Sequence, residues 1–286
     1  MDQRNDIRDF LISRRSRITP EQAGLPAFGT KRRVPGLRRE EVALLAGVSV
    51  DYYTRLERGN LGGVSDPVLG AVAKVLQLDD AERAHLFALA KTNAPSRRER
   101  RKPDVVHVRP SVQRILDALV GAPAWVQNER LDVLATNELC RALNPELYDD
   151  PDQPVNLAKF VFLNPRASDY FADWARQADN AVAMLRIAAG RDPYDTALSN
   201  LVGELSTRSD DFRVRWGAHD VRFHRSGSKR LNNPIVGELD LAYEALELPA
   251  DPGLTLYVLT AGPSSPADDR LKILCSWASA NSSTRR

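Results

Sequence analysis

The segment from Arg39 to Arg58 constrains the fold most, because it has the pattern of two short helices joined by one tight turn. Helices that cross closely need a small residue at their contact, and Ala43 stands there. The turn needs a residue that tolerates positive φ, which Gly47 does. Ser49 then follows as the N-cap of the second helix. The segment therefore predicts a helix-turn-helix.

The second of these helices has two faces of different chemistry. The expected core takes apolar side chains from both helices, namely Val42, Ala46, Val48, Tyr53 and Leu56. The outer face is left to Val50, Asp51, Tyr52, Arg55 and Arg58. A helix of this kind buries its apolar face and offers the other to solvent or to a partner.

The outer face suits DNA, because an α-helix fits the major groove and its N-terminal residues reach the base edges. Base contacts are predicted for Val50, Asp51, Tyr52 and Arg55. We expect Arg55 to pair with guanine and Asp51 to accept from a cytosine amino group. Val50 or Tyr52 is expected to touch a thymine methyl group.

Contacts to phosphates set register and affinity without reading the base sequence. They are predicted for Lys31, Arg32, Arg33, Arg38, Arg39, Ser49, Thr54, Arg58 and Asn60. Two interpretations stay open for the cluster at 31–33. It either reaches the phosphates or the minor groove of DNA, or forms a solvated basic loop.

The distribution of charge agrees with a polyanionic partner for the front of the chain. Residues 1–102 carry 20 Lys and Arg against 13 Asp and Glu, whereas residues 103–286 carry 20 against 25. The front therefore attracts a polyanion and the back repels one, although the net charge of the whole chain is only +2.

The stretch from Leu37 through Arg58-Gly59 resembles bacterial helix-turn-helix regulators of the xenobiotic-response-element type, which are related to phage repressors. The resemblance implies sequence-specific binding to double-stranded DNA. Arg38 departs from the pattern, because the family often has a capping Ser or Thr there, so we expect a weaker helix start or a phosphate contact. Helical patterns complete a five-helix domain at about 5–17, 38–46, 49–58, 66–77 and 79–92.

The rest of the chain mixes strands and helices. A hairpin is predicted at 124–128 and 131–136, with its turn near Asn128. Further strands are predicted at 220–226, 234–247 and 253–260. Helices are predicted at 137–144, 166–189, 193–207, 209–217 and 266–280. The pattern predicts an α+β domain with a small antiparallel sheet.

Residues Leu116 to Trp277 are similar to the ligand-binding domain of MmyB-like regulators. The similarity rests on short segments at 124–126, 135–137, 160–163, 172–174, 216–221 and 236–241. It implies a PAS-like sheet that cups helices, with a long-chain acyl or other apolar ligand inside. No cofactor is expected beyond such a fatty-acid-like ligand.

Large apolar side chains of this domain are candidates to line the cup, with a few polar groups at the ligand head. The lining is predicted from Trp125, Phe160, Phe162, Trp174, Met184 and Trp216. The head group is assigned to Asn137, His219 and Arg222. For each large side chain the alternative stays open that it only fills the core.

The sequence offers no clear catalytic or metal-binding signal. None of its histidines stands at a recognised ligand spacing, and no G-x-S-x-G nucleophile is present. Ser226-Gly227-Ser228-Lys229 matches S-x-x-K by letters, but lies in a polar, strand-like stretch without the helix that such a serine needs. We therefore expect neither an enzyme nor a metal protein.

These observations predict a ligand-controlled transcription regulator that acts as a cytoplasmic homodimer. Its domains are expected at 1–94 for DNA binding, 95–108 for a basic linker and 109–280 for the ligand. No apolar run approaches the ~18 residues of a membrane span. The alternative is an antitoxin-like repressor whose C-terminal domain binds protein instead of a small molecule.

Overall fold

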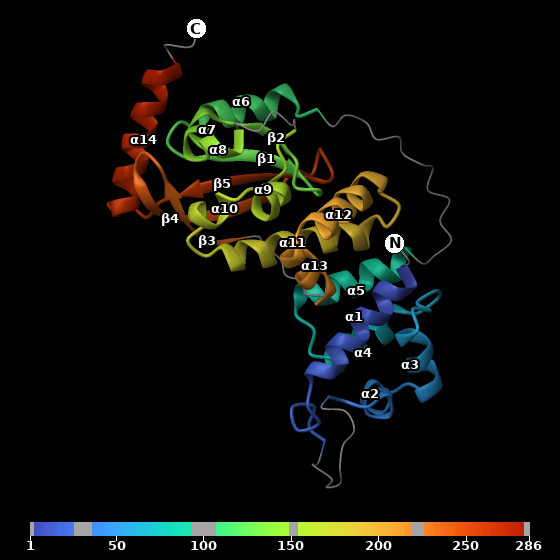
Figure 1. Cartoon of the computed structure of the whole chain (residues 1–286). Coiled ribbons are helices and arrows are strands. Elements are labelled where there is room, and N and C mark those ends of the chain that lie inside the picture. Colours follow the sequence, from blue (N-terminus) through green and yellow to red (C-terminus); the bar gives the residue numbers. More distant parts are fainter. Residues whose placement is uncertain (1–2, 26–35, 93–106, 149–153, 219–225, 283–286) are drawn as a thin grey trace. The chain divides into compact units, whose positions relative to one another are not determined.

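The front of the chain folds into five helices whose apolar side chains meet in one core (Figure 1). They are α1 (Gln3–Arg17), α2 (Arg39–Ala46), α3 (Val50–Glu57), α4 (Asp66–Val75) and α5 (Asp80–Thr92). Ile7, Phe10 and Leu11 of α1 recur at helical spacing and are fully or almost fully buried. The mainly α-helical character of this region is therefore confirmed.

The computed structural model describes residues 3–25, 36–92, 107–148, 154–218 and 226–282. The described residues form two compact units. The first unit takes its residues from 1–99, 186–203 and 214–223, and the second from 100–185, 204–213 and 224–286. Most of the predicted linker at 95–108 lies outside the described residues.

The starts of α4 and α5 differ in their capping interactions. The N-cap of α4 is Ser65, whose side chain makes no capping hydrogen bond, and Pro67 lies in the first turn. Asp79 caps α5, because its Oδ1 accepts from the backbone N–H of Glu82 at 2.8 Å. The Glu82 carboxylate in return accepts from the N–H of Asp79 at 3.2 Å, which completes a capping box.

The back of the chain contains an antiparallel sheet with the strand order β2-β1-β5-β4-β3. Its strands are β1 (Ala124–Asn128), β2 (Val133–Thr136), β3 (Ser226–Asn233), β4 (Gly237–Glu247) and β5 (Leu254–Thr260). The predicted hairpin is confirmed as β1 and β2. Helices connect β2 to β3, as expected of a PAS-like α+β domain.

The two faces of this sheet are covered by different helices (Figure 1). On one face, Val112 and Leu116 of α6 (Pro110–Ala118) pack against Ala124 and Val126. The opposite face, called here the inner face, bears Trp125, Tyr243 and Tyr257 and packs against most of the other helices. Those helices are α7 (Glu138–Leu143), α8 (Pro145–Tyr148), α9 (Leu157–Leu163), α10 (Ala167–Tyr170), α11 (Trp174–Arg191) and α14 (Pro266–Ser282).

Several predicted boundaries are corrected by the structure. The single helix expected at 166–189 is broken into α10 and α11, because Phe171 bridges to Leu231 and the Ala172 N–H donates to the Arg230 carbonyl. Most of the strand predicted at 220–226 lies outside the described residues. The strand that the structure describes there is β3, at Ser226–Asn233. Helices α12 (Thr196–Arg208) and α13 (Asp210–Gly217) lie close to their predicted ranges.

No described helix is both long and apolar enough to cross a membrane. The described residues also contain no group of three or more His, Cys, Asp or Glu side chains placed to hold a metal ion.

Candidate functional site

The turn between α2 and α3 has the geometry that its sequence predicts. Gly47 adopts φ +68°, and its backbone N–H donates to the carbonyls at the end of α2. A Cβ added at Gly47 would meet nothing within 4 Å, so the turn requires glycine for its backbone conformation and not for space. Ser49 Oγ accepts from the Tyr52 N–H at 3.1 Å and caps α3.

The buried face of α3 packs as predicted. Val42, Tyr53 and Leu56 are buried in the core of the first unit, and Ala46 and Val48 pack against it. Burial raises the pKa of the Tyr53 phenol well above its usual range, and the neighbouring Glu57 carboxylate adds to this effect. Tyr53 therefore stays neutral and acts as a core side chain.

The opposite face of α3 is open to solvent. The side chains of Asp51, Arg55 and Arg58 are exposed, and Val50 retains 43% exposure although it is apolar. Tyr52 and Thr54 are half-buried, and Asn60 is exposed beyond the helix end. The candidate base-contacting residues thus share one accessible helix face.

The carboxylate of Glu57 holds α3 against two other helices. Glu57 is only 1% exposed, and its Oε1 accepts from Arg15 of α1 at 2.6 Å. Its Oε2 accepts from Nε of Arg39, the first residue of α2, which keeps 48% exposure. Arg15 also donates to the Leu37 carbonyl at 2.7 Å. Arg39, predicted to contact phosphate, thus also fixes the helix that would enter the groove.

Sequence reasoning missed the role of Glu57, although its position among apolar core residues was a signal. A carboxylate at the end of a buried helical stripe needs a partner when it folds inward. Two arginines supply that partner here, and they lie 42 and 18 residues away along the chain. Only the packing of α1 and α2 on α3 identifies them.

Of the remaining predicted phosphate contacts, some are exposed in the structure and others lie outside the described residues. The Arg38 side chain does not cap α2, and the Glu41 carboxylate accepts from the Arg38 N–H at 2.7 Å instead. Arg38 is exposed, as is Ser49. The cluster Lys31, Arg32 and Arg33 lies outside the described residues.

The turn after α3 also depends on glycine. Gly59 adopts φ +88°, and a Cβ at this position would lie 2.5 Å from the Arg4 carbonyl oxygen of α1. Both conformation and space therefore exclude other residues. This close approach sets the direction in which the chain leaves the exposed helix.

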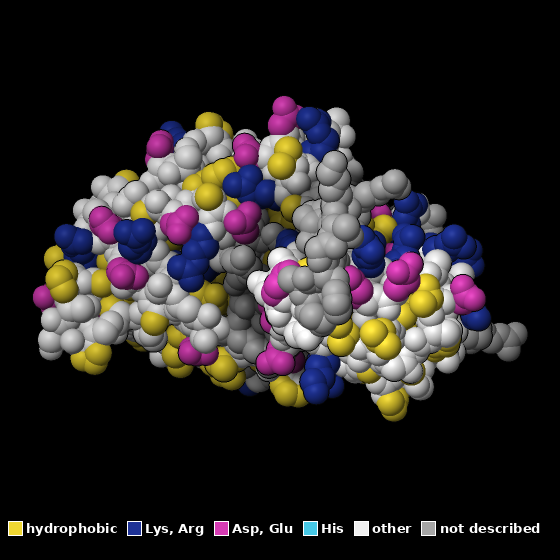
Figure 2. Space-filling view, turned by 90° about the horizontal axis from the view of Figure 1, so that it is seen from below, with side chains coloured by type: hydrophobic (Ala, Val, Ile, Leu, Met, Phe, Trp, Pro, Cys, Tyr) yellow, Lys and Arg dark blue, Asp and Glu magenta, His cyan; other side chains and the backbone are white. Residues whose placement is uncertain are grey.

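The surface around these elements mixes both signs of charge. On the face shown in Figure 2, the described Lys and Arg side chains stand among Asp and Glu, without one continuous basic field. Two of the basic clusters in the sequence, at 31–33 and 97–102, lie outside the described residues. The exposed face of α3 is therefore the main candidate contact among the described residues.

In the second unit, five predicted ligand residues lie on or near the inner face of the sheet. Trp125 stacks on Tyr257 with ring centroids 5.0 Å apart. Phe160 is buried in the same cluster, against which Phe162 and Trp174 pack. Met184 of α11 lies with its Sδ 3.6 Å from the Tyr257 hydroxyl. The structure thus brings Trp125 and Met184 to the same tyrosine.

The Asn137 amide is fully engaged by the protein. Its Oδ1 accepts from the N–H groups of Ala124 and Cys140, and its Nδ2 donates to the carbonyls of Leu119 and Ala122. An asparagine amide has two donor hydrogens and two acceptor positions, so none remains for a ligand. Asn137 caps α7 and holds the hairpin closed, and we do not retain it at the ligand head group.

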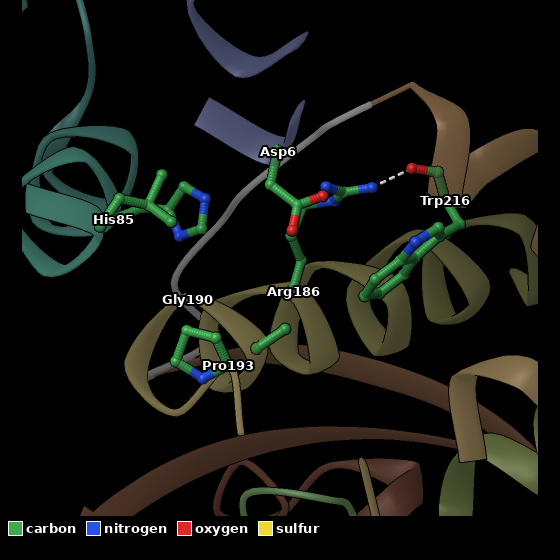
Figure 3. A pocket seen from close by; sticks show the side chains of 8 residues that line it. Asp6, His85, Arg186, Gly190, Pro193 and Trp216 are labelled. Carbon is green, nitrogen blue, oxygen red and sulfur yellow. Dashed lines mark hydrogen bonds between the residues drawn. The ribbon is translucent and has the colours of Figure 1, made fainter. Parts of the chain in front are cut away.

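Unlike the other described lining residues, which belong to the second unit, Trp216 belongs to the first. There the Arg186 guanidinium lies 4.3 Å from the centre of its ring and donates to its carbonyl. Figure 3 shows both residues beside a small pocket with Asp6, His85, Gly190 and Pro193. Its free volume of about 10 Å³ holds at most one water molecule. His219 and Arg222 lie outside the described residues.

One residue of the inner face was not predicted as part of a site. Lys229 of β3 places its Nζ 5.3 Å from the centre of the Tyr243 ring and 5.6 Å from that of Trp125. Its sequence context is polar, and its only recognised pattern, S-x-x-K, is one of catalytic serines and not of ligand binding. The register of β3 gives Lys229 this position.

Comparisons with protein families match the N-terminal helices and the C-terminal α+β region separately. Residues 14–86 match the helix-turn-helix domain family, and residues 108–274 match the family described as MmyB-like transcription regulator ligand binding domain. No curated protein matches the chain in a sequence comparison. Both families are domains of transcription regulators, and neither is a catalytic family.

Proposed function

Because the chain belongs to the MmyB-like family of transcription regulators, we propose that α3 reads a specific operator and that an apolar ligand in the second unit controls this binding. The regulator acts in the cytoplasm, where a bacterial operator is accessible. The observation that carries the DNA part is the exposed polar face of α3, held on a buried core by its own cap and by Glu57.

The residues at the start of α3 are the proposed base readers. Val50 and Asp51 stand in the first turn and Arg55 lies on the same exposed side. Arg55 reads guanine by a bidentate contact, Asp51 accepts from a cytosine amino group, and Val50 or Tyr52 touches a thymine methyl. Tyr52 is only half-buried, which leaves part of its ring for this contact.

Phosphate contacts fix the helix in the groove. Among the described residues they come from Arg38, Arg39, Ser49, Thr54, Arg58 and Asn60. Arg39 can serve both DNA and Glu57, because its guanidinium carries five donors and its side chain remains half exposed. Lys31, Arg32 and Arg33 belong to the same proposed set.

The regulator acts as a homodimer in this proposal. One helix-turn-helix reads only a few base pairs, and two-fold pairing doubles the recognised sequence. Half-sites then lie about one helical turn apart, ~34 Å between centres. Hydroxyl-radical footprinting of a selected operator should show two protected half-sites with that spacing.

The proposed ligand is a fatty acid or a similar apolar molecule on the inner face of the sheet. Trp125, Phe160, Phe162, Trp174 and Met184 supply apolar and aromatic surface there. His219 and Arg222 remain proposed polar contacts, whereas Trp216, which packs on Arg186 in the first unit, is not retained. Such a ligand changes operator affinity only if it binds the two DNA-binding states with different affinities.

Substitution of Arg55 tests the DNA part. Arg55→Ala should relax base preference at one operator position and lose ~1–3 kcal/mol of discrimination. Charge removal at Lys31, Arg32 and Arg33 should weaken all duplexes about equally and flatten the salt dependence. Arg83→Ala, an exposed arginine on α5, is the control. An unchanged ranking of operator variants in the Arg55 variant would show that another element reads the bases.

Mass spectrometry of the purified, denatured protein tests the ligand part. Recovery of an acyl lipid, or saturable binding of added fatty acids, supports the proposal. Failure of both contradicts it. A stoichiometric copurified protein would instead support a repressor whose second domain binds protein.

A further inference from the structure

Lys229 points toward the inner face of the sheet. It lies opposite Leu241 in the β3–β4 ladder, and Leu231, two residues further along β3, lies opposite Leu239. Those three leucines are buried in the core cluster of the inner face. Because side chains two residues apart share one face of a strand, the Lys229 side chain lies on the inner face, where it is half-buried.

The ammonium group reaches far across that face. β3 and β1 are separated by β4 and β5 in the sheet, so their backbones lie about three strand spacings, ~14 Å, apart. Nevertheless Nζ lies 5.6 Å from the ring centre of Trp125 on β1. The cation therefore stands over the inner face of the sheet, beside the stacked pair Trp125–Tyr257.

No described carboxylate neutralises this cation. The ion pairs among the described residues of the second unit involve other lysines and arginines, and the contacts of Lys229 are the rings of Trp125 and Tyr243. The neighbouring Cys140 thiol is buried, and burial raises its pKa, so it remains neutral. Contacts with aromatic rings favour a cation but do not replace a counter-ion.

Although Lys229 is half-buried as a residue, desolvation of its ammonium group lowers its pKa to about 8. At neutral pH the group is therefore still mostly protonated, in surroundings that disfavour its charge. A charge held in apolar surroundings is normally paired, because unpaired burial costs free energy. A ligand anion would supply the missing partner.

We propose that Lys229 anchors the carboxylate head group of the apolar ligand, while Trp125, Tyr257 and Met184 contact its hydrocarbon chain. This inference rests on the proposed function, because it requires that the second unit binds such a ligand. A single ammonium matches a singly charged carboxylate. The site should therefore select free acids over esters and alcohols of the same chain length.

The test uses the full-length, delipidated protein and three C16 probes, namely palmitate, methyl palmitate and hexadecyl phosphate. Binding is measured by calorimetry and by the fluorescence of tryptophan, since Trp125 lies beside the proposed head-group site. A charge-assisted contact contributes ~1.5–3 kcal/mol, so palmitate should bind about 10- to 100-fold more tightly than its methyl ester.

Lys229→Met should abolish this preference while methyl palmitate still binds, and Lys229→Arg should retain it. Arg230→Met is the matched control, because Arg230 is the next residue of β3 and its side chain is exposed. It removes one positive charge from the same strand and should leave the preference intact. Thermal unfolding checks that each variant is folded.

The outcomes separate this inference from the proposed function. If no probe binds the wild-type protein, the ligand-binding proposal itself fails. If palmitate and its ester bind equally well, or if Lys229→Met keeps the preference, only the anchor is wrong. If hexadecyl phosphate binds more tightly than palmitate, the site takes a phosphate head group and the carboxylate assignment is overturned.

Discussion

The exposed face of α3 and the inner face of the sheet place their candidate residues in opposite ways. α3 carries its candidates within one helix of eight residues, supported by a cap and a glycine turn that lie next to it in sequence. The inner face gathers Trp125, Lys229 and Tyr243 from three strands. A surface on one helix is specified locally, whereas a set of residues on one face of a sheet is specified by strand register.

We expect the largest loss of stability at Glu57, because this residue ties the locally specified helix α3 to α1 and α2. Glu57→Ala removes the shared partner of Arg15 and Arg39 and leaves the poorly exposed Arg15 uncompensated. Loss of one member of a buried ion pair destabilises by ~3–5 kcal/mol. Urea unfolding followed by helical circular dichroism measures this effect. Arg39→Ala should reduce the free energy of unfolding much less, since Arg39 is half exposed. An equal loss would mean that the Arg39–Glu57 pair, and not the Arg15–Glu57 pair, stabilises this contact.

Gly47→Ala tests how strictly the local turn is specified. The residue adopts φ +68° with open space around a Cβ, so the cost is conformational and amounts to ~1–2 kcal/mol. Gly47→Asn should cost less, because asparagine adopts this conformation more readily. Thermal unfolding of both variants measures the difference. Equal destabilisation by alanine and asparagine would indicate a steric cause.

The pH dependence of ligand binding tests the inner face. Around Lys229, burial raises the pKa of Cys140 and Tyr243, and that of Tyr257 to about 12. None of these three loses a proton before Lys229, whose pKa is about 8. Palmitate affinity should therefore fall about tenfold between pH 7 and pH 9, as the ammonium of the free protein is lost. Lys229→Met should bind palmitate with no such decline.

The same group affects stability without ligand in the opposite sense. Its pKa in the folded protein, about 8, lies below the ordinary value of 10.5. The unfolded chain therefore binds more protons between these values, and this contribution raises stability as pH increases through that window. Unfolding of the delipidated protein at several pH values, compared with Lys229→Met, isolates the contribution.

The smallest effect is expected at the cap of α3. Ser49→Ala removes the Oγ that accepts from the Tyr52 N–H and should cost ~1 kcal/mol. Operator affinity should fall with the stability of the helix, while the ranking of operator variants remains. A changed ranking would mean that Ser49 itself takes part in base recognition.

The sequence alone determined the five front helices, the turn at Gly47 and the exposed set on α3. Helical spacing, caps and positive φ act over three or four residues, so residues that are neighbours in the sequence specify these features. It also identified the hairpin of β1 and β2, whose strands alternate around a short turn.

Only the tertiary structure decided which distant residues meet. The sequence did not predict a strand over most of β3, because this polar edge strand lacks an apolar alternation, and a shift of one residue would have turned Lys229 away from Trp125. The partners of Glu57 and the closed hydrogen-bond set of Asn137 depend in the same way on packing between separated segments. Local propensity carries no information on such pairings, because strand register and helix contacts are set by the whole core.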